Sequence, residues 1–142
     1  MKTIVTIALS LCFYVCAPAV CEAAEVQTVH VEVLYMNHGP MRSTIKNLQE
    51  LFAKQQEYVV ESWFDFESKE GAEFKKTKGV TAHVPCMIWL DNLNSVDVDG
   101  NTVTFTGFPT GAGPKSFQGH WNLDELEKAL TNAIKAKNPG MQ

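Results

Sequence analysis

The chain has 142 residues and a formal net charge of -4; 45% of its residues are hydrophobic and 20% are charged. The length suggests a single domain, and the composition is ordinary for a folded globular protein. The acidic balance argues against a nucleic-acid ligand, which rewards clustered Lys and Arg, and no basic run is long enough to bind a membrane surface.

The N-terminal residues have the pattern of an export signal. A positive charge near the start precedes residues 4–15, which are mostly apolar but too few to span a bilayer as a helix. Cleavage after Ala19, Ala23 or Ala24 would fit the preference for small residues at a cleavage site. The polar sequence that begins at Glu25 favours the last two. The alternative is an uncleaved anchor or a buried strand.

We therefore predict a signal peptide at residues 1–24 and an exported domain at residues 25–142, periplasmic or extracellular, with no stable membrane insertion after cleavage. Three of the four cysteines, Cys12, Cys16 and Cys21, fall inside the predicted signal. The domain then keeps Cys86 alone, so it has no internal disulfide framework and must be held together by its core.

Hydrophobic periodicity predicts alternating strands and helices in this domain. Strands are expected at 29–36, 58–66, 84–90 and 95–106, helices from residue 41 onward, at 69–78 and at 122–137, and a Gly- and Pro-rich loop at 107–119. Helices between the early strands imply right-handed parallel crossovers, whereas the final strand pair is antiparallel. The expected order is β-α-β-α-β-β-α.

Local signals define several of these boundaries. Gly39-Pro40 ends the first strand, and Asp99-Gly100 has the sequence of a hairpin turn. Gly79 is placed to end the second helix. Asn122 is placed to cap the last helix, with Glu125 at the capping-box position.

Two short sequences in this order are similar to motifs of the thioredoxin superfamily. Residues 37–42, Asn-His-Gly-Pro-Met-Arg, lie where thioredoxins carry Trp-Cys-Gly-Pro-Cys-Lys/Arg, between the first strand and its helix. Residues 79–86, Gly-Val-Thr-Ala-His-Val-Pro-Cys, resemble the family's Gly-Val-x-x-x-Pro-Thr run. The resemblance covers residues 29–137. It implies a compact three-layer α/β sandwich with a mixed sheet, and a cis Pro85 that faces the first motif.

The departures from the family pattern remove its usual chemistry. His38 stands in place of the attacking cysteine and Met41 in place of the resolving one. Dithiol–disulfide exchange needs a thiolate to attack and a second thiol to release the mixed disulfide. We therefore predict that the chain is redox-inactive in this sense.

The first functional hypothesis is a binding module for a protein or peptide, without catalytic residues. The resemblance implies a groove beside the cis-proline in which an extended polypeptide is held, with the loop 107–121 as a lid. The residues expected to form it are His38, Gly39, Pro40, Met41, Val84 and Pro85.

The second hypothesis is a copper-binding or copper-delivery protein. His38, Met41 and Cys86 would supply the soft ligands that suit Cu(I), with His83 as a further ligand. The partial positive charge of a helix N-terminus opposes a cation there. Met41 as a core gap-filler and Cys86 as a buried thiol are the simpler readings.

The third hypothesis is a monothiol enzyme at Cys86. A catalytic thiol needs solvent access and a lowered pKa, and the sequence offers His83 or His38 as a base but no third group to orient it.

Overall fold

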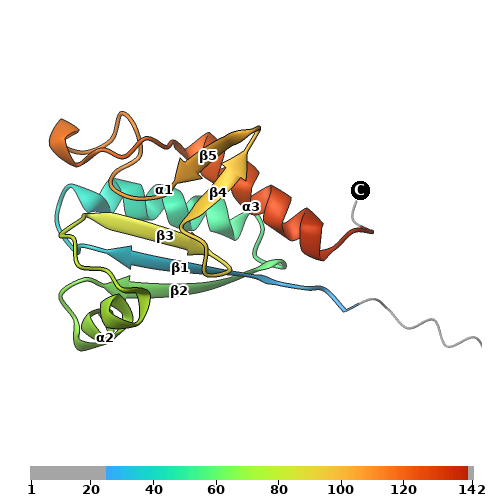
Figure 1. Cartoon of the computed structure of the whole chain (residues 1–142), viewed down its shortest axis with the longest axis horizontal. Helices are drawn as coiled ribbons and strands as arrows, with labels where there is room; N and C mark the ends of the chain where they lie inside the picture. The colour runs from blue at the N-terminus through green and yellow to red at the C-terminus, as the bar shows by residue number, and fades with distance from the viewer. Residues whose placement is uncertain (1–24, 141–142) are drawn as a thin grey trace, which may run out of the picture.

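The computed structural model describes residues 25–140, so the predicted signal peptide at residues 1–24 lies outside the described part of the chain. The elements are β1 (Val29–Tyr35), α1 (Met41–Ala53), β2 (Val59–Asp65), α2 (Lys69–Lys78), β3 (Cys86–Leu90), β4 (Ser95–Val98), β5 (Asn101–Thr104), the 3₁₀ turn η1 (Lys115–Phe117) and α3 (Leu123–Lys137) (Figure 1). No helix within residues 25–140 is long and apolar enough to cross a membrane.

The central sheet is mixed, as predicted. Its strand order is β2-β1-β3, with β2 parallel to β1 and β3 antiparallel to β1. The segment after β5 runs along the free edge of β3, where Ile88 N–H donates to Phe105 O at 3.0 Å and Gly107 N–H donates to Cys86 O at 2.8 Å. This segment therefore extends the sheet beyond β3.

The predicted strand at 95–106 is divided into β4 and β5, which pair with each other as a separate antiparallel hairpin. The turn between them is the one that the sequence indicated. Asp99 and Gly100 both have positive φ, 53° and 83°, and positive φ at both central residues suits the twist of a two-residue hairpin.

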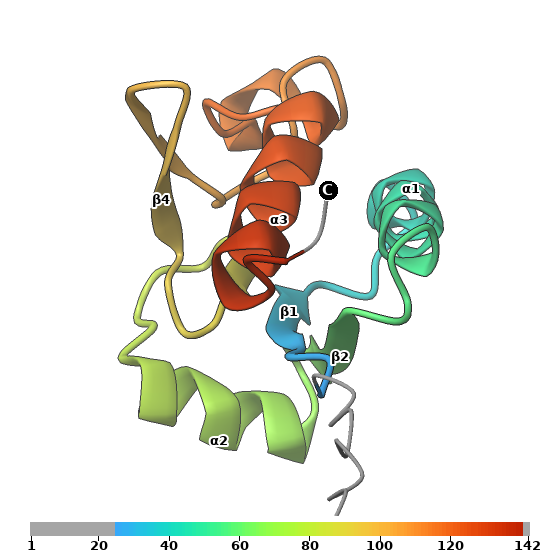
Figure 2. The ribbon, with the colours of Figure 1, turned by 90° about the vertical axis from the view of Figure 1, so that its right-hand side faces the viewer.

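Helices cover both faces of the sheet and make three layers. Figure 2 shows α1 and α3 on one side of β1 and β2, and α2 on the other. Successive side chains of β1 point to opposite faces of the sheet. Val31 and Val33 belong to the core under α1 and α3, whereas Leu34 belongs to a smaller core that includes Phe74 of α2. The molecule is thus a mixed α/β sandwich with three α-helices within the described residues.

The predicted ends of α2 and α3 are confirmed. Gly79 ends α2 in the left-handed conformation, with φ at 67°, and its N–H donates to Lys75 O and Lys76 O. Asn122 caps α3, accepting from Glu125 N–H, while the Glu125 carboxylate accepts from Asn122 N–H. This reciprocal pair fixes where the chain leaves the loop and enters α3.

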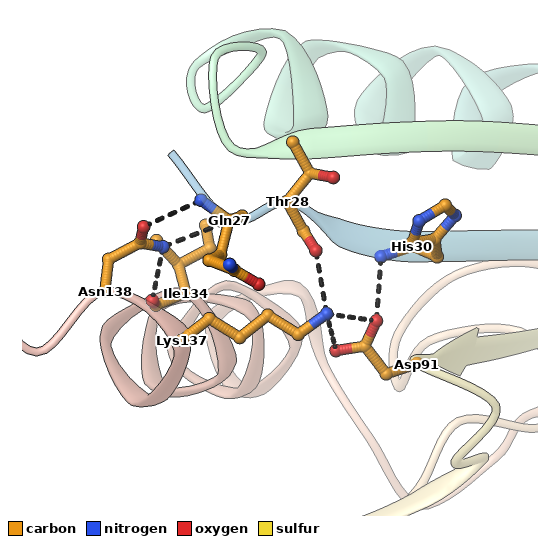
Figure 3. A network of polar contacts seen from close by, with 7 residues as sticks. All are labelled: Gln27, Thr28, His30, Asp91, Ile134, Lys137 and Asn138. Carbon is orange, nitrogen blue, oxygen red and sulfur yellow. Dashed lines mark hydrogen bonds and ion pairs between the residues drawn. The ribbon is translucent and has the colours of Figure 1, made fainter. Parts of the chain in front are cut away.

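A polar network fastens the two ends of the described chain together (Figure 3). Lys137, the last residue of α3, donates to Thr28 O at 2.7 Å and to Asp91 Oδ1 at 2.8 Å. Asp91 Oδ1 also accepts from His30 N–H at 3.0 Å. The next residue, Asn138, accepts from Gln27 N–H and donates to Gln27 O. These contacts hold α3 against the beginning of β1.

Candidate functional site: an apolar cavity at the start of α1

Three segments meet at one end of the sheet and enclose a cavity of about 240 Å³. The connection from β1 to α1 supplies one wall, with Met36, His38, Pro40 and Met41. The segment before β3 contributes His83 and Pro85, and the loop after β5 contributes Phe108, Pro114 and Phe117. The predicted motif residues and the predicted lid loop therefore share one cavity.

The β1–α1 connection is held in a tight turn by its own backbone. His38 N–H donates to Met36 O at 2.9 Å, and Met41 N–H donates to His38 O at 3.0 Å. Helix α1 begins after Pro40, which suits a first turn because proline has no N–H to leave unpaired. No side chain caps this end of α1, so His38 is not a capping residue.

The environments of the two motif side chains differ. Met41 is buried and packs in the main core, whereas the His38 side chain is 53% exposed, with its Nε2 3.8 Å from Glu67 Oε1. His38 therefore presents a polar group that solvent or a ligand can reach.

The expectation of a cis Pro85 is wrong: no peptide bond within residues 25–140 is cis. The segment that contains Pro85 still forms part of the cavity wall. Pro85 O accepts from Met36 N–H at 2.9 Å, and this bond links the segment to the connection between β1 and α1. This bond continues the antiparallel pairing of β1 and β3 beyond the Tyr35–Cys86 pair. A regular ladder thus fixes where Pro85 lies without a cis bond.

The same segment leaves backbone donors free beside the cavity. Thr81, Ala82 and His83 are exposed and Val84 is half-buried. Among the residues that the structure describes, no group accepts a hydrogen bond from the N–H of any of these four. The His83 ring stands edge-on to the Phe66 ring, with 5.2 Å between the centroids.

The loop after β5 is pinned at two aromatic residues and open at a third. Phe108 is 3% exposed and Trp121 is 1% exposed, and Trp121 Nε1–H donates to Thr106 O at 3.2 Å. Hydrogen bonds from Phe108 N–H to Phe117 O, at 2.9 Å, and from Gly119 N–H to Phe108 O, at 2.7 Å, close the loop. Phe117 remains 50% exposed at the rim of the cavity.

Four of the six residues predicted for the groove line this cavity and two do not. His38, Pro40, Met41 and Pro85 line the cavity; Gly39 and Val84 lie beside them in sequence but do not line it. Val84 instead lines a neighbouring hollow with Met87 and Trp89. Successive side chains of an extended segment point to opposite sides, so the neighbours Val84 and Pro85 line different hollows.

The predicted copper ligands are only partly brought together. His38 and Met41 line the cavity, whereas Cys86 does not and lies in the core at the beginning of β3, 1% exposed. No group of three or more His, Cys, Asp or Glu side chains within residues 25–140 is arranged to hold a metal. These four residue types do not include methionine, whose thioether sulfur can also bind copper.

Cys86 does not meet either condition set for a reactive thiol. It has no solvent access, and burial raises the pKa of its thiol to about 12. A neutral buried thiol is a poor nucleophile, so Cys86 packs as a small hydrophobic residue.

Four cavity residues were not named as site residues from the sequence. Met36 follows β1, two residues before His38, and Phe108, Pro114 and Phe117 lie in the loop that was expected to act as a lid. The spacing Met-x-His-x-x-Met at residues 36–41 was visible in the sequence, whereas only the folded loop could show that Phe117 reaches the same place.

Comparisons with known protein families, with curated proteins and with solved structures found no match to this chain.

Proposed function

We propose that the chain is an exported, thioredoxin-like binding protein without dithiol–disulfide exchange activity, and that the cavity at the start of α1 holds an apolar side chain of an extended peptide. The strand order β2-β1-β3, with parallel and antiparallel neighbours and helices on both faces, is the arrangement expected of a compact thioredoxin-like domain.

The observation that carries the peptide proposal is the coincidence of free backbone donors and an apolar cavity. The N–H groups of residues 81–84 donate to no described group, and in an extended segment alternate ones face the same edge; an extended peptide adds as a further strand to unpaired groups of this kind. The cavity lies alongside them, lined mainly by methionine, proline and phenylalanine side chains. Backbone hydrogen bonds would supply affinity, and the cavity would select the side chain that enters it.

Phe117 is the wall residue best placed to respond to a ligand. Half of its side chain is exposed at the cavity rim, and covering that half with a peptide would contribute about 1 kcal/mol, a factor of about five in affinity.

The test uses labelled, unstructured peptides that differ only at one central residue, which is Ala, Leu or Phe, with binding measured by fluorescence anisotropy. The Leu and Phe peptides should bind more tightly than the Ala peptide. Phe117→Ser should weaken them by about fivefold. Leu93→Ser is the matched control, because Leu93 is 59% exposed outside the cavity. Equal binding of all three peptides, or equal effects of both substitutions, would contradict the proposal.

A further inference from the structure

We propose that the outer edge of β2 pairs with the same edge of a second copy of this chain, in antiparallel orientation and with Ser62 on the twofold axis. The strand order β2-β1-β3 places β2 at the outside of the three-stranded sheet. Figure 2 shows β2 at one side of the molecule, next to β1. Pairing at this edge would join the sheets of two copies into one continuous sheet.

The backbone groups of β2 that face outward follow from its bonds to β1. At the two ends of this parallel pair, Tyr58 O accepts from Val29 N–H at 2.8 Å, and Phe66 N–H donates to Tyr35 O at 2.7 Å. Every second residue of a strand bonds to a given neighbour, so the even-numbered residues of β2 face β1. The odd-numbered residues therefore direct their backbone N–H and C=O groups outward.

The middle of this outer edge is unpaired. No group among residues 25–140 bonds to the outward backbone groups of Glu61 and Trp63. β2 contains no proline and no lysine and pairs with β1 without a bulge, and Val60 is 43% exposed. Natural edge strands commonly carry such features, which prevent pairing with another chain. The charges of Glu61 and Asp65 are the remaining restriction on a partner strand.

Those charges select one register for a second copy. A ladder forms only where outward-facing residues lie opposite each other. With Glu61 on the twofold axis, the Glu61 carboxylates of the two copies would lie opposite each other. With Trp63 on the axis, Glu61 would lie opposite Asp65 of the second copy. Like charges directly opposite are destabilising, and a ladder with Ser62 on the axis avoids both arrangements.

With Ser62 on the axis, the side chains of the two strands also match. Glu61 lies opposite Trp63 of the second copy, and the two residues exchange a pair of backbone hydrogen bonds. The same side chains already bond within one chain, where Trp63 Nε1–H donates to Glu61 Oε2 at 2.8 Å. On the other face, Val60 lies opposite Phe64 of the second copy, an apolar pair that favours the ladder. β2 is thus complementary to itself, as a twofold interface requires.

The experiment tests this register with an engineered disulfide. The parent is the full chain with Cys12, Cys16 and Cys21 replaced by serine, so that buried Cys86 is its remaining thiol. Ser62→Cys should form a covalent dimer under mild oxidation, seen by electrophoresis without reductant. Residues opposite each other in a non-hydrogen-bonded pair have Cα atoms about 4.5 Å apart, which is within the range of a disulfide.

Val60→Cys is the matched control on the same strand and face. Val60 is more exposed than Ser62, but with Ser62 on the axis the two Val60 positions lie about 13 Å apart along the strands. Val60→Cys should therefore cross-link at least about tenfold more slowly than Ser62→Cys. Equal rates, or faster cross-linking through Val60→Cys, would overturn the proposed register.

Sedimentation of the parent measures the dimer without a cross-link. Its apparent mass should rise with concentration. Ser62→Lys places two ammonium groups opposite each other and should raise the dissociation constant by about tenfold or more, while urea unfolding checks that the variant is folded. The mass of one chain at every concentration, or association that Ser62→Lys leaves unchanged, would overturn the proposal. The peptide proposal would stand, because residues 81–84 precede β3, on the other side of β1.

Discussion

Replacing Lys137 by methionine should lower the free energy of unfolding at pH 7 by about 1–2 kcal/mol. The ammonium donates to Thr28 O at 2.7 Å and to Asp91 Oδ1 at 2.8 Å, and lies 2.8 Å from Asp91 Oδ2 (Figure 3). Hydrogen bonds to charged groups contribute about 1.5–3 kcal/mol each. The side chains of Lys137 and Asp91 are 32% and 31% exposed, so solvent screening reduces that total. Methionine keeps the apolar stem and its packing.

The effect should depend on pH through Asp91. Burial alone would raise the pKa of this carboxyl. The hydrogen bonds from Lys137 and from the His30 backbone, together with the attraction of Lys137, outweigh burial and lower the pKa below its ordinary value. A carboxyl with a lowered native pKa stabilises the fold above its unfolded pKa of about 3.9, and this contribution is lost as pH falls through the native pKa.

Urea unfolding followed by tryptophan fluorescence, at a series of pH values from 7 to 3, measures both effects. Asp91→Asn supplies the second arm of a double-mutant cycle, and asparagine tolerates the positive φ of 46° at this position. We expect a coupling free energy of about 1 kcal/mol at pH 7 that shrinks below about pH 4. A coupling of zero at pH 7, or one that grows on acidification, would refute the reasoning.

Three further predictions concern a buried hydroxyl, the glycine that ends α2 and the buried thiol. Thr44 is 1% exposed and its Oγ1 has no partner among the described residues, so Thr44→Val should raise the thermal midpoint by about 4 °C; a lower midpoint would show that the hydroxyl is bonded. Gly79→Ala should cost about 1 kcal/mol in urea unfolding, because alanine is strained at φ 67° although it meets no atom. Gly39→Ala, at a glycine without positive φ, should cost less. Cys86, with its raised pKa of about 12, should react with a thiol reagent at pH 8 roughly a hundredfold more slowly in the native chain than in urea, and equal rates would contradict its burial.

The sequence by itself determined the elements, because their signals are local. Hydrophobic periodicity located α1, a charged segment that ends at Gly79 located α2, and the pair Asn122 and Glu125 marked the start of α3. The turn at Asp99-Gly100 was also readable, since the two residues that adopt positive φ are adjacent in the chain. Each of these features depends on residues within one or two turns of each other.

The composition of the site was decided by tertiary structure. His38 and Met41 could be selected from the motif, but Cys86 could not be excluded until the pairing of β3 with β1 placed its side chain in the core. The same pairing bonds Pro85 O to Met36 N–H with a trans peptide, where the resemblance had implied a cis one. Phe117 reaches the cavity because the loop closes on Phe108. These outcomes depend on contacts between residues that are distant in sequence. Local sequence signals do not show which distant residues a strand or loop will contact.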